Sequence, residues 1–472
     1  MKSFLTRIIV ASIVFTSIIN ISSAQDLTMY GMNRLHQSIF QNPAYQTQCK
    51  VSLGLPAVFS SRYFEITNTG FTYNDVFKKG TGLQKDSIFI DLDNLEKSLD
   101  KVNYIKSEIN NSLFSLGFWV TDFYVTLDIT NKIQFRLGYP KEFVSIRNAM
   151  GSDNTIDFSG LGINSNAYNE FSFGLSKKIM PGVVVGGKIK RLWGIYDIST
   201  TKSEISVQTS EDLSTMNVHG DIQINAAPLP ITIYRNAKNK IDSLSSTYTD
   251  KDWQATDVIN TFVKNKNRGW AFDLGITYKL SKRLELSASI VDFGWIKWKT
   301  DPVQLRGYGD FSYNGLDIAP SLRDNSLDIG QELIDSITNS FDAIDTRNSY
   351  KTYLNTKIFF GANYLLTQNI NVGVLSRTLF YDKKPHQSLT FSLNMNAGRG
   401  FMLMGTYSMV NRSFANLGLG MAVKIGWFQM YAITDNFGGL IWPKNTKSIL
   451  SLRFGTNLLF GCKKKFDYGI ID

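Results

Sequence analysis

The residue types that most often do chemistry are sparse and scattered in this sequence. The three histidines, His36, His219 and His386, lie far apart, and none stands in an H-E-x-x-H pattern that would bring two zinc ligands together. Asp91 and Asp93 could suggest a metal site, but capping of the following helix is the better interpretation of Asp91. We therefore expect no metal site and no cofactor.

Motifs that carry catalysis are also missing from the chain. No G-x-S-x-G elbow, phosphate-binding loop or G-x-G-x-x-G fingerprint stands between a strand and a helix. The glycine-rich residues 417–420 lie inside an alternating segment, where glycine allows close packing or a bend. Residues 292–294 spell the kinase magnesium motif Asp-Phe-Gly, but no partner motif accompanies them. We therefore expect that the protein is not an enzyme.

The N-terminus has the features of a secretory signal peptide. Lys2 and Arg7 precede a short apolar run over residues 8–19, and the small residues 22–24 follow it. The pattern predicts a signal peptide over residues 1–24, cleaved near Ala24. The alternative, an N-terminal membrane anchor, is less favoured because the apolar run is short for a membrane span.

Charge and cysteine content limit the partners and the type of fold. The chain carries a formal net charge of +10, and its one dense basic run, residues 463–465, reads better as a solvated tail than as a nucleic-acid site. We expect no nucleic-acid partner. Only Cys49 and Cys462 are present, so the chain is not a disulfide-stapled scaffold. The two cysteines lie near opposite ends of the mature chain, and the sequence leaves open whether they pair.

The strongest pattern in the chain is an alternation with period two over unusually long segments. Odd positions from Phe123 to Tyr139 are apolar except for Asn131, whereas the even positions are polar except for Tyr124 and Gly138. Because successive side chains of a strand point to opposite faces, this segment predicts a two-faced strand. Globular strands average five or six residues, whereas a tilted strand needs about 9–11 residues to cross a bilayer.

The alternation recurs along the chain, and short turns join several of the segments. We expect fourteen strands, at 112–120, 122–139, 168–180, 183–205, 213–225, 268–280, 283–299, 351–366, 369–382, 386–397, 400–411, 414–425, 427–435 and 447–461. The prediction is an all-β fold, a transmembrane antiparallel β-barrel over residues 111–461. A secreted β-sandwich is the less favoured alternative.

Composition agrees with a barrel whose two faces differ. Aromatic residues make up 13% of the chain, and yet the mean hydropathy is only −0.12. Membrane helices would need long apolar runs. In strands with one lipid-facing and one polar face, the hydropathies of the two faces cancel, and the mean stays near zero. Polar positions of the strands supply the candidates for lumen-facing charged residues, which are Asp128, Arg136, Asp273, Glu285 and Arg453.

The remaining segments are expected to be insertions or a plug. Residues 25–110 are predicted to form an N-terminal plug or periplasmic segment, with an amphipathic helix from Leu92 to Ile109. Helical insertions are expected at 253–263 and 325–345, and a tail at 462–472. By counting hairpins, the long connection 140–167 falls on the inner side of the membrane, which is unusual for a barrel.

The sequence also resembles known outer-membrane families. Residues 42–45, Asn42-Pro43-Ala44-Tyr45, resemble an N-terminal motif of Bacteroidota proteins of the PorP/SprF type. The chain lacks the Ser-Gln-aromatic run before this motif and the glycine after it. Further blocks are similar to an uncharacterised Bacteroidota family, a domain of unknown function related in pattern to FadL- and PorV-type barrels; they are residues 51–56, 168–171, 287–298, 429–436 and 452–461. The resemblance implies a FadL-like barrel of fourteen strands with a plug.

Two hypotheses on function follow from these expectations. The first is a plugged channel in the cell outer membrane for small or hydrophobic solutes. The second is a non-transporting anchor or assembly subunit of a cell-surface or type IX secretion-like complex. The expected surroundings are outer-membrane lipid and, in the second case, a protein partner from that complex.

Overall fold

A computed structural model describes the chain over most of its length. The described residues are 27–55, 61–82, 85–149, 155–211, 215–229, 231–235, 241–246, 266–313, 340–381, 384–398, 400–410, 413–441 and 448–462. The predicted signal peptide, the insertion 253–263 and the tail beyond Cys462 lie outside them. Among the described residues, no helix is long and apolar enough to cross a membrane.

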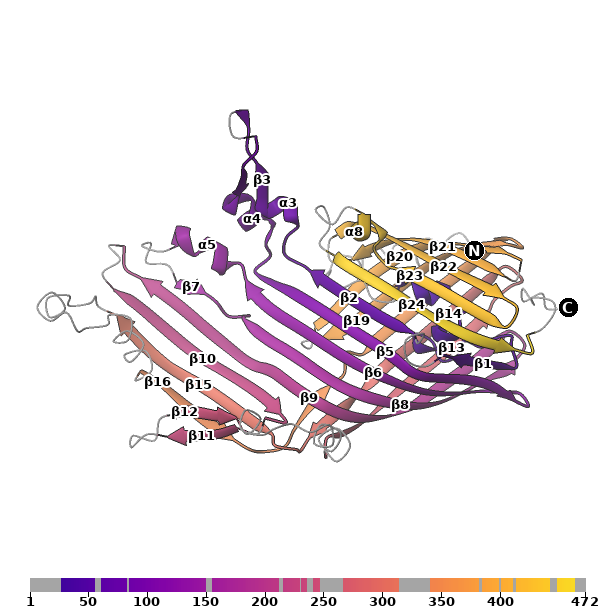
Figure 1. The fold of residues 1–472 in the computed structure, drawn as a ribbon, viewed down its shortest axis with the longest axis horizontal. Helices are drawn as coiled ribbons and strands as arrows, with labels where there is room; N and C mark the ends of the chain where they lie inside the picture. Colours follow the sequence, from indigo (N-terminus) through magenta and orange to yellow (C-terminus); the bar gives the residue numbers. More distant parts are fainter. Residues whose placement is uncertain are drawn as a thin grey trace, which may run out of the picture.

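The main body is a closed antiparallel β-barrel (Figure 1). In the part of the chain that the structure describes, fourteen strand positions form its wall. Their order is β1 (Val51–Gly54) with β2 (Arg62–Asn68), β5 (Val102–Val120), β6 (Phe123–Pro140), β8 (Gly162–Met180), β9 (Val183–Thr209), β13 (Arg268–Lys279), β14 (Leu284–Trp298), β17 (Tyr350–Tyr353) with β18 (Lys357–Thr367), β19 (Ile370–Tyr381), β20 (Lys384–Ala397), β21 (Phe401–Val410), β22 (Ser413–Ile425), β23 (Phe428–Thr434) and β24 (Ser448–Phe460). Both β1 and β2 pair with β24 on one side and with β5 on the other, which closes the ring.

The barrel is apolar outside and polar inside, the reverse of a soluble protein. On β8, Phe171, Phe173 and Leu175 are each 41% exposed, whereas the intervening Ser172 and the preceding Glu170 are buried. The same alternation runs along β13, β20 and β22. An apolar outer surface of this kind belongs in lipid, where closed strand pairing also satisfies every backbone group. The fold is therefore that of a transmembrane β-barrel, as the alternation predicted.

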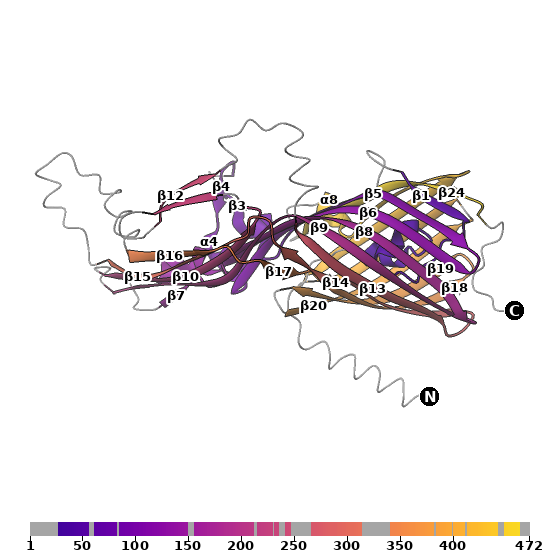
Figure 2. The same ribbon diagram turned by 90° about the horizontal axis from the view of Figure 1, so that it is seen from below.

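A sheet continues beyond one end of the barrel. The first part of β9 pairs with β13, and residues 197–209 of the same strand pair with β10 (Met216–Ala227). Strand β10 pairs in turn with β15 (Val303–Tyr313), and β15 with β16 (Phe341–Thr346). We call this extension the distal sheet; Figures 1 and 2 show it beside the barrel, together with the short β7 (Thr155–Asp157) and the hairpin β11 (Ile231–Arg235) and β12 (Ile241–Ser246).

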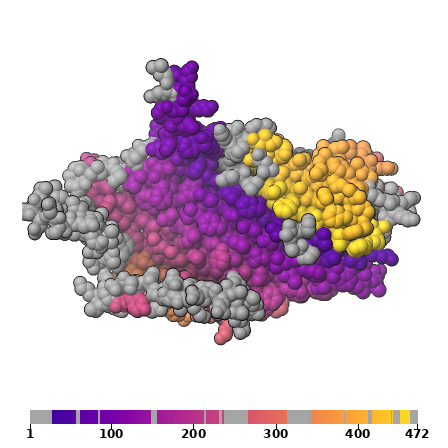
Figure 3. All heavy atoms as spheres, in the orientation of Figure 1, coloured from indigo at the N-terminus to yellow at the C-terminus, as the bar shows by residue number. Residues whose placement is uncertain are grey.

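Residues 71–82 and 85–100 form a separate projection. It contains α3 (Tyr73–Val76), β3 (Phe77–Lys79), β4 (Ile88–Ile90) and α4 (Leu92–Ser98), and it stands out from the body in the space-filling view (Figure 3). We call it the projection. Nearby lies α5 (Glu142–Ala149), and α8 (Phe437–Ile441) follows β23. As predicted, Asp91 caps α4, because its carboxylate accepts a hydrogen bond from the Asn94 backbone N–H at 2.9 Å.

The strand count is confirmed, but the membership of the wall differs in two places. A wall strand was expected at residues 213–225, but residues 216–225 belong to β10 of the distal sheet. Residues 51–54 and 62–68 were placed in the plug, and they form the two pieces of the first wall strand. The two differences cancel in the total. Because the first strand was not predicted, the predicted directions of the next strands were reversed. The connection between β6 and β8 therefore starts and ends at the distal end of the barrel, the end with the long connections, and not on the inner side.

The predicted helices were partly wrong. The helix expected from Leu92 to Ile109 ends at Ser98, and β5 begins at Val102. Ile105 and Ile109 are four positions apart, and this spacing puts two side chains on one side of a strand as well as of a helix. At the end of the predicted insertion 325–345, Phe341 starts strand β16; residues 325–339 lie outside the described ones.

Candidate functional site: the plugged lumen

The N-terminal residues 27–50 lie inside the barrel, and we call them the plug (Figure 2). The plug starts with α2 (Leu27–Gly31), continues with the 3-10 helix η1 (His36–Phe40) and leads to Cys49. Most of its side chains are buried, polar ones included. The plug therefore fills the lumen over the section where it lies, and it is shorter than the predicted plug of residues 25–110.

The motif Asn42-Pro43-Ala44-Tyr45 forms the turn that attaches the plug to the wall. The Asn42 side chain accepts a hydrogen bond from the Ala44 N–H at 2.9 Å, and it donates to the backbone oxygens of Ile276 and Ala288, both at 3.4 Å. Tyr45 is buried next to Tyr30 of the plug, with ring centroids 5.5 Å apart. One fully buried amide thus fixes both the turn and its position against β13 and β14.

Two glycines of the wall make room for this turn. A Cβ atom at Gly186 of β9 would overlap the backbone of Pro43, and a Cβ atom at Gly275 of β13 would overlap the Asn42 side chain. The plug backbone can approach these strands only where side chains are absent. The glycines therefore belong to the same contact as the motif.

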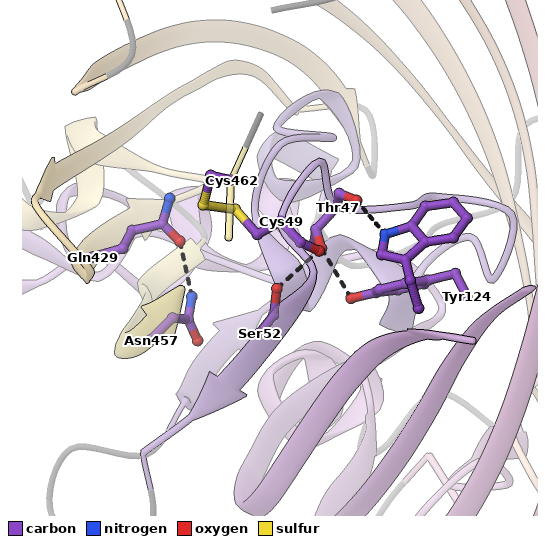
Figure 4. The surroundings of a disulfide bond; sticks show 8 residues. Thr47, Cys49, Ser52, Tyr124, Gln429, Asn457 and Cys462 are labelled. Atoms are coloured by element: carbon purple, nitrogen blue, oxygen red, sulfur yellow. Dashed lines mark hydrogen bonds between the residues drawn. A yellow bond between two sulfur atoms is a disulfide. The ribbon is translucent and has the colours of Figure 1, made fainter. Parts of the chain in front are cut away.

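The end of the plug is held by a disulfide bond between Cys49 and Cys462 (Figure 4). Cys49 precedes the first wall strand and Cys462 follows the last one, so the bond joins the two sides of the closing seam. Thr47 also holds the plug end, because its backbone oxygen accepts a hydrogen bond from the Trp119 indole at 3.0 Å and its hydroxyl lies 3.0 Å from the hydroxyl of Ser52. The sequence had left this pairing open.

His36 joins the plug to the charged interior of the wall. Its ring nitrogens lie 2.8 Å from the Ser115 hydroxyl and 3.1 Å from the Tyr124 hydroxyl. Ser115 in turn donates to Asp128, which pairs with Lys188 at 2.8 Å. Burial lowers the pKa of His36 to about 4, and the nearby Lys188 adds to this, whereas Asp128 opposes it. His36 is therefore neutral at pH 7.

Next to plug residues 40 and 41, ion pairs link the inner faces of five neighbouring wall strands, β6, β8, β9, β13 and β14. Lys190 contacts Asp273 and Asp292, each at 2.7 Å, and Lys132 contacts Glu170 at 2.9 Å and Asp292 at 3.0 Å. We call these five residues the charged belt. Asp292 has a left-handed φ of 59°, next to a shift in the β13–β14 register, and its N–H donates to Asp273 at 2.8 Å. The bulge places both Val291 and Asp292 on the buried side of β14.

A cavity of about 170 Å³ lies at the distal mouth of the barrel, and we call it the vestibule. Strands β5, β6, β8, β9, β17 and β19 contribute its lining. Polar side chains dominate it: Lys106, Glu108, Gln134, Arg136, Asn164, Asn166, Asp197, Ser199, Thr352 and Asn355. Tyr381 forms one wall, and the Arg136 guanidinium lies 4.9 Å from the centre of its ring. This cavity suits a small polar molecule better than an apolar one.

The structure spreads the predicted lumen-facing residues along the barrel. Asp128 lies beside the plug, Asp273 in the charged belt and Arg136 in the vestibule. Glu285 lines a second cavity at the opposite end, and Arg453 lies 4.6 Å from the ring centre of Tyr63, beside the belt. These five residues therefore do not form a single site.

Sequence reasoning predicted Arg136 and Arg453 as cations of the lumen but missed three buried or half-buried lysines. Lys188 pairs with the predicted Asp128, and Lys190 pairs with the predicted Asp273. Lys132 pairs with Glu170 and Asp292, which were not among the predicted lumen-facing residues. All three lysines stand at polar positions of alternating strands, so the same signal that selected Asp128 would have found them. Among the described residues, no group of three His, Cys, Asp or Glu side chains could hold a metal ion.

The fold and the lumen define the class of this protein, a transmembrane β-barrel whose lumen holds its own N-terminal segment. Residues 43–435 match a family described as a family of unknown function, DUF5723. The match covers most of the chain, so the protein belongs to that family. No curated protein matches the sequence.

Solved structures of similar shape are barrels at very low sequence identity. The toluene transporter TbuX of Ralstonia pickettii is 7% identical, with a TM-score of 0.41 over 90% of this chain and 93% of that chain. A FadL homologue of Pseudomonas aeruginosa is 10% identical, with a TM-score of 0.34 over 90% of this chain and 91% of that chain. These scores are too low to carry an argument, so the fold stands on the strand pairing above.

Proposed function

We propose that this protein is an outer-membrane channel for small polar solutes that is closed at rest by the plug. The observation that carries the proposal is the arrangement along the lumen: a polar vestibule at one mouth, then the charged belt, then a segment held at its far end by a disulfide. A solute in the vestibule cannot pass through the lumen unless the plug moves. The polar lining favours such solutes over the hydrophobic ones that the FadL-type resemblance implied.

The orientation follows from the lengths of the connections. Turns at the disulfide end are short, as between β5 and β6 or between β8 and β9, whereas long connections and the distal sheet lie at the other end. In outer-membrane barrels, short turns face the periplasm and long loops face outward. The vestibule would then open to the cell exterior, and the signal peptide would direct the chain to the outer membrane.

Liposome permeation tests the channel. The full chain and a variant without residues 27–48 are reconstituted, and the entry of small sugars and amino acids is measured. We expect little entry through the full chain and rapid entry through the shortened one. The variant Gly275→Val, which displaces the plug without deleting it, should lie between the two. Impermeable liposomes with all three proteins would contradict the proposal.

A second candidate function, an anchor or assembly subunit, is favoured by the surface of the projection. Ile88 and Ile90 are 61% and 62% exposed, and Phe77, Phe89 and Leu92 are exposed near them. Contiguous apolar groups outside the lipid zone often mark protein contacts. Cross-linking in native membranes would recover a stoichiometric partner with the intact protein, and a variant with residues 72–98 replaced by a short linker would lose it. Recovery of no partner with either protein would contradict this function.

A further inference from the structure

The periplasmic mouth of the barrel contains a cavity that the channel proposal does not use. It has a volume of about 300 Å³ and lies between the plug and the short turns. Plug residues 44–49 and the Cys49–Cys462 disulfide form part of its wall. The plug separates it from the vestibule, so it is open to the periplasmic side alone.

The charged groups lining this cavity are nearly all of one sign. The plug contributes Arg34, the strand ends contribute the half-buried Lys279 and Lys424, and one turn contributes Lys282 and Arg283. The lining contains one carboxylate among the described residues, that of Glu285, which stands opposite Lys279 in the β13–β14 ladder. A concave site with one sign of charge attracts and holds ligands of the opposite sign.

The neutral part of the lining includes several side-chain amides, which can hydrogen-bond to a peptide backbone. Asn363, Asn371, Asn396 and Gln429 reach the cavity from four different strands. Asn396 is only 4% exposed, and its side-chain oxygen has no hydrogen-bond partner among the described residues. A buried acceptor without a donor is costly, and a backbone N–H of a bound chain would satisfy it.

We infer that this cavity binds an extended acidic segment of a periplasmic protein. Carboxylates of the segment would pair with Lys279, Lys424 and the turn cations, while its backbone would bond to the amides. Since the plug forms one wall of the cavity, such a partner would contact residues 44–49 directly. The inference shares with the proposed function only the orientation of the barrel, and its test needs no solute flux.

Binding is measured on the full-length protein in a zwitterionic detergent. The probe is a fluorescein-labelled octapeptide of alternating Glu and Gly, and the comparison peptide has Gln in place of Glu. We expect the acidic peptide to bind, the Gln peptide to bind at least about tenfold more weakly, and added salt to weaken the acidic one. Equal binding of both peptides, or no binding of the acidic one, would overturn the inference.

A matched pair of variants separates the cavity from general surface charge. The double variant Lys279→Gln/Lys424→Gln removes two cations of the lining. The control Lys50→Gln/Lys178→Gln removes two exposed lysines at the same end that do not line the cavity. We expect roughly tenfold weaker binding in the first and less than a twofold change in the control.

Two results would overturn the inference at this stage. Equal weakening in both double variants would mean that acidic chains bind to the general positive charge at this end of the barrel and not to the cavity. Displacement of the peptide by phosphatidylglycerol vesicles, with no displacement by phosphatidylcholine vesicles, would assign the cations to lipid headgroups instead. Heat-modifiability of each variant on a gel confirms that the barrel has folded before binding is measured.

Discussion

At the scale of single residues, contacts between small groups decide where the plug lies. The Asn42 amide, the turn at Pro43 and the two wall glycines form one contact, and each part is needed for the others to fit. The sequence marked residues 42–45 only through a resemblance. Gly186 and Gly275 gave no signal of their own, because glycine at a strand position does not show which backbone approaches it.

Filling the space beside the turn should displace the plug. In Gly275→Val the new side chain overlaps Asn42 and the backbone at Ala44, so the plug must shift while the barrel still closes. Amide hydrogen exchange over residues 27–48 should become at least about tenfold faster. The reason is that the overlap destabilises the docked position of the plug by more than about 1.4 kcal/mol. The control is Gly405→Val, where a Cβ meets no atom within 4 Å. Unchanged exchange in Gly275→Val would contradict the contact.

The buried His36 should make plug attachment dependent on pH. Its pKa is about 4 in the folded protein and near 6.5 when exposed, so the docked plug binds fewer protons than the released one. The contribution of neutral His36 to the stability of the docked plug is then complete above pH 6.5, and it is lost as the pH falls toward 4. Hydrogen exchange of residues 27–48 across this range should follow that course, and His36→Gln should flatten it. A wild-type profile that is flat from pH 7 to 4 would contradict this assignment.

At the scale of elements, ion pairs join strands that are distant in sequence. Lys190 of β9 contacts Asp273 of β13 and Asp292 of β14 with little exposure to water. Removing Lys190 takes the cation away from the buried Asp273, whereas Asp292 keeps its ion pair with Lys132. Lys190→Met should lower the free energy of unfolding by about 3 kcal/mol, measured by guanidinium titration in detergent. The exposed Lys178→Met should change it by less than 0.5 kcal/mol, and equal effects would contradict the role of the belt.

The sequence predicted the elements of the wall well where strands are regular. Alternation located β6, β13, β20 and β22 because each has one lipid face and one polar face over its whole length. It failed at the first wall strand, which is divided between β1 and β2 and so shows no long alternation. It also failed to separate the distal sheet from the wall, since β10 alternates like a membrane strand but lies beyond the barrel.

At the scale of the whole molecule, the disulfide closes a loop that contains almost the entire described chain. The two cysteines are 413 positions apart, and the bond lies where the first and last wall strands meet. Loss of the bond in Cys462→Ser should lower the free energy of unfolding by about 2–4 kcal/mol, since the unfolded chain gains freedom. Reduction of the wild-type protein should produce the same change and leave the variant unaffected. No difference between oxidised and reduced wild type would contradict the role of this bond.

The central claim is that the chain forms a closed transmembrane barrel in the outer membrane. Heat-modifiability on a gel tests it most directly, because a folded barrel migrates differently before and after boiling. The outer-membrane fraction is separated without and with boiling, and the protein is detected by an antibody. We predict that the protein occurs in this fraction and that boiling shifts its migration. A soluble protein with the same migration before and after boiling would contradict the claim.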